Sequence, residues 1–60
     1  MAWYRIYFFD RNGHIGRALD IECADDDEAV RRMDEEKHAF PLELWQRERR
    51  IRRLEPIGGG

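Results

Sequence analysis

The chain has 60 residues, a formal net charge of −2 and a single cysteine, and 40% of its residues are charged. A chain of this length forms at most one domain and buries only about 60% of the surface of its unfolded form, so its margin of stability is small. It has no serine, no threonine and no second cysteine, which excludes hydroxyl nucleophiles other than tyrosine and an intrachain disulfide, and no stretch approaches the roughly 18 apolar residues of a membrane span.

The first predicted element is a β-hairpin. Residues 3–10 (WYRIYFFD) are rich in aromatic and branched side chains, which is typical of a strand. Asn12-Gly13 supplies the two positive-φ positions of a type I′ turn, so we expect a two-residue loop. This loop fixes the register, in which the cross-strand pairs are Trp3–Glu22, Tyr4–Ile21, Arg5–Asp20, Ile6–Leu19, Tyr7–Ala18, Phe8–Arg17, Phe9–Gly16 and Asp10–Ile15.

The register sorts the side chains of the hairpin onto two faces. It makes Arg5 and Asp20 a cross-strand ion pair and places Phe9 over a glycine, and a slip by one residue would lose these matches. The apolar side chains gather on the other face, which we expect to form the core: Tyr4, Ile6, Phe8, Leu19, Ile21 and Cys23.

The second predicted element is a helix. Asp25 is a suitable N-cap, and Glu28 stands at the N3 position of a capping box. We expect the helix to stop near His38, because Pro41 disfavours helical backbone at the residue before it. Its narrow apolar stripe is made by Ala29, Val30 and Met33 and is extended by the stem of Lys37.

Two further strands are predicted, at residues 42–46 and 50–55. A hairpin centred on Arg47-Glu48 joins them, and a four-residue loop would keep the same register. A three-residue loop would set Leu44 against Arg52, which is a poorer match. The favoured register gives apolar, cation–π and ionic pairs, namely Leu44–Ile51, Trp45–Arg50 and Glu43–Arg52.

The elements predict one α+β domain of ββαββ order in residues 1–57. A four-stranded antiparallel sheet with one helix on one face is the natural architecture for this order. Residues 58–60 are three glycines, which we interpret as a flexible tail or an expression remnant.

One helix covers only one face of such a sheet, and the other face carries more aromatic surface than a solvated face usually does. We expect a symmetric dimer that buries this second face, because small domains often gain stability by self-association and because aromatic residues and arginine are enriched at interfaces. The expected interface residues are Trp3, Arg5, Tyr7, Phe9, Trp45, Arg50 and Arg52, and Leu54 shares the parity of the last two.

Two other partners fit the same face. Single-stranded nucleic acid could stack on the aromatic side chains and place its phosphates at the arginines, although the net negative charge and the acidic helix oppose this. A different protein could bind at this face or at an exposed sheet edge.

The charges are spread unevenly along the chain. Nine acids and two arginines lie between Asp20 and Glu36, and five arginines and two glutamates lie between Arg47 and Glu55. These two regions either pair with each other or present a polar surface to a partner.

The residues that could support catalysis have simpler structural explanations. Residues 25–28 (DDDE) lack the glycine-containing pattern of an EF-hand loop, and a helix start accounts for them. His14, Cys23 and His38 do not have the spacing of zinc ligands. Cys23 would be a nucleophile only if His38 approached it, and its place on the apolar face favours a buried core residue. We therefore expect a non-enzymatic protein without metal or cofactor.

The segments Tyr4–Asp10 (YRIYFFD) and Glu43–Arg53 (ELWQRERRIRR) carry a resemblance. The chain resembles a class of short bacterial proteins that open with an aromatic strand and end with an ELWQ segment followed by arginines. Those proteins often have glycine directly after Trp-Gln, where this chain has Arg47-Glu48. The class has no known activity, so the resemblance implies a bacterial origin and no function. The single thiol suits a reducing cytoplasm better than a secreted scaffold, so we expect a cytoplasmic protein.

Overall fold

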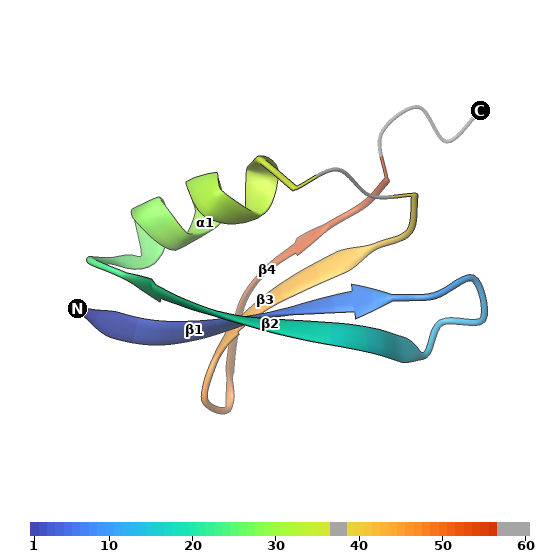
Figure 1. The fold of residues 1–60 in the computed structure, drawn as a ribbon, viewed down its shortest axis with the longest axis horizontal. Helices are drawn as coiled ribbons and strands as arrows, with labels where there is room; N and C mark the ends of the chain where they lie inside the picture. The colour runs from blue at the N-terminus through green and yellow to red at the C-terminus, as the bar shows by residue number, and fades with distance from the viewer. Residues whose placement is uncertain (37–38, 57–60) are drawn as a thin grey trace.

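The computed structural model describes residues 1–36 and 39–56, and these form a twisted antiparallel sheet with one helix on one side (Figure 1). The elements are β1 (Ala2–Phe9), β2 (Ile15–Cys23), α1 (Asp26–Asp34), β3 (Leu42–Gln46) and β4 (Arg49–Leu54). The strand order is β2-β1-β3-β4, and every neighbouring pair is antiparallel. The predicted α+β fold of ββαββ order is confirmed. The glycines at 58–60 lie outside the described residues.

The β1–β2 hairpin has the predicted register over most of its length, from Trp3–Glu22 to Phe8–Arg17. Next to the turn the prediction is wrong, because Phe9 pairs with Ile15 and Gly16 is an extra residue in β2. The loop of this hairpin is one residue longer than predicted. The β-bulge compensates for that residue, so the pairs farther from the turn keep the predicted register.

The loop of this hairpin has three residues instead of two. The Asp10 amide donates to the His14 carbonyl at 2.7 Å, and the Gly13 amide donates to the Asp10 carbonyl at 3.0 Å. Gly13 has a φ of 81°, whereas Asn12 does not have a positive φ, so the turn is not type I′. The wider loop is favoured because one carboxylate oxygen of Asp10 accepts hydrogen bonds from the Asn12 and His14 amides, each at 2.9 Å.

Helix α1 begins as predicted and ends earlier than predicted. The side chain of Asp25 accepts a 2.9 Å hydrogen bond from the Glu28 amide, which confirms the N-cap. The Glu28 carboxylate reaches back to the Ala24 amide at 2.6 Å, one residue before the position of a standard capping box. The helix ends at Asp34, because the Glu35 amide bonds to two carbonyls and the final turn tightens; the predicted end at His38 lies outside the described residues. Within the described part of the chain, no helix is long and apolar enough to cross a membrane.

The β3–β4 hairpin pairs Trp45 with Arg50 as predicted, but it departs from the predicted register beyond that pair. Ile51 is an extra residue in β4, so Leu44 lies opposite Arg52. The predicted pairs Leu44–Ile51 and Glu43–Arg52 are therefore wrong. The bulge lets both Ile51 and Leu54 pack against the core, which strict alternation would prevent because one would then lie on each face.

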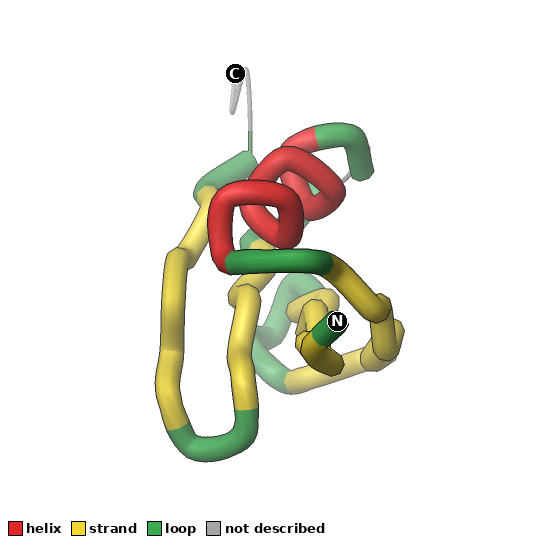
Figure 2. Tube along the Cα trace, turned by 90° about the vertical axis from the view of Figure 1, so that its left-hand side faces the viewer, coloured by secondary structure: helices red, strands yellow, loops and turns green. Residues whose placement is uncertain are grey.

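The core lies between α1 and the sheet. The predicted core residues are confirmed, with Phe8 and Leu19 only partly buried. Figure 2 shows the helix along one side of the strands while the opposite side of the sheet has no element against it. The buried cluster consists of Tyr4, Ile6, Ile21, Cys23, Ala29, Met33, Leu42 and Leu44.

Candidate interaction surface

The face of the sheet that α1 does not cover is called the open face here. Strand pairing and alternation define its members. It contains six of the seven predicted interface residues, and the bulge in β4 moves the seventh, Arg52, to the helix side opposite Leu44. The same bulge places Leu54 against the core, so the expectation that Leu54 lies on the open face is also wrong. The open face consists of Trp3, Arg5, Tyr7, Phe9, Ile15, Ala18, Asp20, Glu22, Glu43, Trp45, Arg50 and Arg53.

The aromatic side chains of the open face differ in exposure. Trp3 is 63% exposed, whereas Tyr7, Phe9 and Trp45 are half-buried. The rings of Tyr7 and Trp45 pack edge to face with their centroids 6.3 Å apart. The Arg53 guanidinium lies 5.5 Å from the centre of the Phe9 ring. The aromatic residues therefore cover one another in part, and Trp3 is the most open of them.

Glu43 is a buried carboxylate in the middle of the open face, with 7% of its surface exposed. One of its oxygens accepts a hydrogen bond from the Trp45 indole at 2.9 Å. The other lies 2.6 Å from the Arg53 guanidinium and 3.5 Å from that of Arg50. Burial alone raises the pKa of Glu43, but the indole and the two guanidinium groups outweigh it, so the pKa lies below its ordinary value.

Sequence reasoning recognised Glu43 as an ion-pair residue and missed its role as the centre of a network. The predicted partner was Arg52, and the bulge at Ile51 brings Arg53 there instead. The usable signal was a glutamate two residues before a tryptophan in a strand, since this spacing puts both side chains on one face.

The predicted ion pair between Arg5 and Asp20 is confirmed, with a nitrogen–oxygen distance of 2.7 Å. The Arg5 guanidinium holds the pKa of the Asp20 carboxyl below its ordinary value. Both side chains are about half exposed, so the pair neutralises this part of the open face and contributes little to stability.

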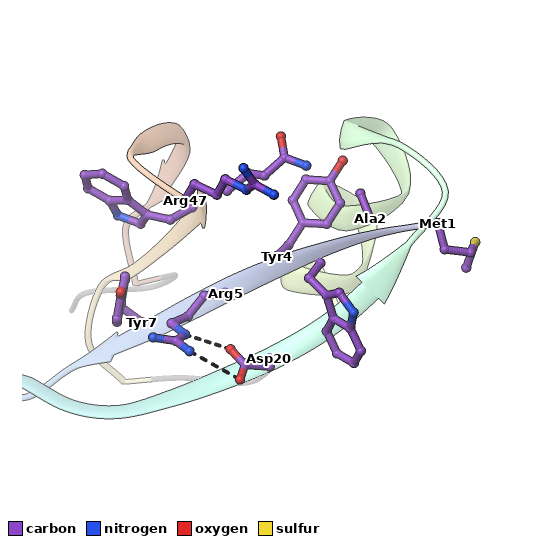
Figure 3. Close-up of a pocket in the computed structure, with 10 residues that line it drawn as sticks. Met1, Ala2, Tyr4, Arg5, Tyr7, Asp20 and Arg47 are labelled. Carbon is purple, nitrogen blue, oxygen red and sulfur yellow. Dashed lines mark hydrogen bonds and ion pairs between the residues drawn. The ribbon is translucent and has the colours of Figure 1, made fainter.

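An open groove of about 530 Å³ lies where β1 and the β3–β4 turn diverge. Figure 3 shows Met1, Ala2 and Tyr4 of the β1 side, and Arg47 on the side of the turn. The Arg5–Asp20 pair is part of the groove lining, and a second concavity of about 400 Å³ shares Tyr7, Trp45 and Arg47 with the groove. The lining of the groove is Met1, Ala2, Trp3, Tyr4, Arg5, Tyr7, Asp20, Trp45, Gln46 and Arg47.

A second network lies on the helix side and joins the acidic and basic regions of the sequence. The Asp26 carboxylate accepts a hydrogen bond from the Tyr4 hydroxyl at 2.8 Å and two from Arg49, at 3.1 and 3.2 Å. The hydrogen bond to Asp26 and the burial of the ring raise the pKa of Tyr4 to about 12. Internal pairing between the two charged regions, one of the two predicted alternatives, therefore occurs at this point.

The residues considered for catalysis are placed as follows. Cys23 is fully buried, and burial raises the pKa of its thiol. Asp25 caps the helix, and His14 is exposed in the first hairpin. His38 lies outside the described residues. Among residues 1–36 and 39–56, no group of three His, Cys, Asp or Glu side chains is arranged to hold a metal ion.

Comparison with known proteins gives no match to a protein-family model, to a curated protein or to a solved structure. The open face and its groove are therefore the features from which a function is inferred.

Proposed function

We propose that this chain is a non-catalytic protein-interaction module that self-associates as a dimer through its open face. The observation that carries the proposal is Trp3, a tryptophan that is 63% exposed on a sheet face without a covering element in the described chain. Tryptophan, tyrosine and arginine are the residue types that supply most of the binding energy at protein interfaces. The single cysteine supports a reducing, cytoplasmic setting for this module.

The charges of the open face support a protein partner over nucleic acid. Positive and negative side chains are present in equal number. The positive ones are Arg5, Arg50 and Arg53, and the negative ones are Asp20, Glu22 and Glu43. Two of the arginines already neutralise the Glu43 carboxylate. A nucleic acid binds to a surface with an excess of unpaired positive charge. Two identical faces that pack against each other need side chains of both charges, so that opposite charges can meet.

The size of the molecule is also compatible with a dimer of this kind. The molecule measures 36 × 20 × 15 Å, and each partner in a stable interface buries ~800 Å², so a dimer would use most of the open face. Pairing of two open faces would remove both Trp3 side chains from water.

Light scattering and native mass spectrometry at micromolar concentrations test the proposal. We expect a dimer for the wild type and a monomer for Trp3→Ala. Arg52→Ala is the matched control, because Arg52 is exposed on the helix side, and this variant should remain dimeric. A wild-type monomer whose two tryptophans are both accessible to a fluorescence quencher would contradict the proposal.

A titration with short single-stranded RNA and DNA at low salt tests the rival function. We expect no binding, because the open face has no net charge. Binding that weakens steeply with added salt would instead favour a nucleic-acid module.

A further inference from the structure

The groove next to Trp3 contains a stretch of strand with no neighbour on one side. Pairing between β1 and β3 begins at Arg5–Trp45 and does not include the residues of β1 that precede Arg5. Strand β3 ends at Gln46, and the chain then turns at Arg47. The first residues of β1 therefore have β2 on one side and, within the described chain, no strand on the other.

The hydrogen-bond pattern of the sheet shows which backbone groups face the groove. The Phe9 amide donates to the Pro41 carbonyl at 3.0 Å, in line with the β1–β3 register. In an antiparallel ladder, every second residue directs its N–H and C=O toward the same neighbour. Trp3 is an even number of residues from Phe9, so its N–H and C=O point into the groove, where no strand of the described chain pairs with them.

The side chains around this backbone are aromatic and cationic. Trp3, Tyr7 and Trp45 line the groove together with Arg5 and Arg47. Arg5 is paired with Asp20, whereas Arg47 has no ion-pair partner among the described residues. Arg47 directly follows β3 and lines the groove, so a chain extended along the first residues of β1 toward β3 meets this turn.

We propose that the groove binds the C-terminal end of an extended peptide, which pairs with the backbone of Trp3 and places its terminal carboxylate at Arg47. A peptide parallel to β1 brings its carboxylate to this turn, where Arg47 supplies a charge-assisted contact. An antiparallel peptide would bring its ammonium group to the same arginine, and the two would repel each other. Addition of a strand to an exposed edge is an established mode of peptide recognition, with affinity that comes from main-chain hydrogen bonds.

The groove shares Trp3, Arg5, Tyr7, Asp20 and Trp45 with the open face, so a second copy of the chain and a peptide would compete for it. The peptide titration is therefore made at a protein concentration at which the chain is monomeric. Because recognition of the main chain tolerates many sequences, the probe is a pool of N-acetylated peptides of randomised sequence. One pool has free C-terminal carboxylates, and the other is amidated. The readouts are the NMR signals of the Trp3 amide and of the Arg47 side chain, and the hydrogen-exchange rate of the Trp3 amide.

We expect the free-acid pool to shift both signals, to slow exchange of the Trp3 amide, and to bind about tenfold more tightly than the amidated pool. Arg47→Gln should abolish the difference between the pools. Arg52→Gln should preserve it, because Arg52 is an exposed arginine outside the groove.

Absence of any shift at millimolar peptide, or equal affinity for the two pools, would overturn the proposed site. Either result leaves self-association untouched, because that property is measured as mass. A wild-type monomer that still binds the free-acid pool would contradict the dimer and leave the peptide site intact.

Discussion

The indole Nε1–H of Trp45 donates a 2.9 Å hydrogen bond to the carboxylate of Glu43, which lies two residues earlier on the same face of β3. The second oxygen of this carboxylate accepts from Arg53 at 2.6 Å. A single buried acid thus orients the half-buried tryptophan and an arginine of the neighbouring strand. This is how the open face combines aromatic surface with charge and leaves no buried side-chain polar atom of the described residues without a partner.

Replacement of Glu43 tests this network. Glu43→Gln keeps an acceptor for Trp45 but removes the charge between Arg50 and Arg53. We expect the free energy of unfolding to fall by about 1–3 kcal/mol, the usual cost of an unsatisfied buried polar group, as measured by urea denaturation. Glu55→Gln is the control, since Glu55 pairs with the same Arg53 at an exposed position, and it should have little effect. Equal stability of the two variants would show that Glu43 is not central.

The first hairpin allows the turn type to be tested by two neighbouring substitutions. Gly13 has a φ of 81°, and a Cβ there would meet no atom within 4 Å, so the cost of alanine is conformational. We expect Gly13→Ala to destabilise the protein by about 1 kcal/mol. Asn12→Ala should change stability much less, because Asn12 does not have a positive φ. Equal losses at both positions in thermal denaturation would indicate the type I′ turn instead.

Much of the fold could be predicted from alternation, and the departures occur where one strand contains an extra residue. The register from Trp3–Glu22 to Phe8–Arg17 was derived from a two-residue loop at Asn12-Gly13 and agreed with the side-chain chemistry of both faces, which a slip by one residue would destroy. The bulges at Gly16 and Ile51 could not be predicted in this way. A bulge moves the later residues of its strand to the opposite face of the sheet. Whether it is favourable depends on which side chains it brings to the core.

The residues of the open face were predicted correctly wherever the side chains of a strand alternate regularly between the two faces of the sheet. Trp3 and Trp45 lie where alternation placed them, whereas Arg52 does not, because the bulge at Ile51 precedes it. The strand order and the end of β1–β3 pairing are long-range features. No local pattern in the sequence indicates that, within the described chain, β1 has no neighbouring strand at Trp3 on the side away from β2.

Arg47 is in a left-handed conformation that favours glycine, with a φ of 55°. We expect Arg47→Gly to be more stable than Arg47→Ala by about 0.5–1 kcal/mol, since both remove the side chain and only glycine relieves the backbone strain. Urea denaturation of the pair measures the difference. If the alanine variant were equally stable, the turn would carry no strain.

Acid should weaken the fold. The pKa of Asp26 lies below its ordinary value because of Arg49 and Tyr4, that of Asp20 because of Arg5, and that of Glu43 also lies low. A carboxyl with a lowered pKa in the folded state stabilises the fold above its unfolded pKa, and the contribution is lost as the pH falls through the folded value. We therefore expect the free energy of unfolding to decline below a pH of about 4, near the unfolded pKa of these groups. Asp26→Asn should make the decline shallower than in the wild type.

Alkali should weaken the fold through Tyr4. The hydrogen bond to Asp26 and burial raise its pKa from 10.0 to about 12, so between these values the unfolded chain loses the tyrosine proton and the folded chain retains it. Stability that is fully present below pH 10.0 is then lost as the pH rises toward about 12. We expect the free energy of unfolding to decline across this range in the wild type and in Tyr7→Phe, and to decline less in Tyr4→Phe. An identical alkaline decline in Tyr4→Phe and the wild type, measured by urea denaturation at fixed ionic strength, would show that the Tyr4–Asp26 bond does not couple folding to this proton.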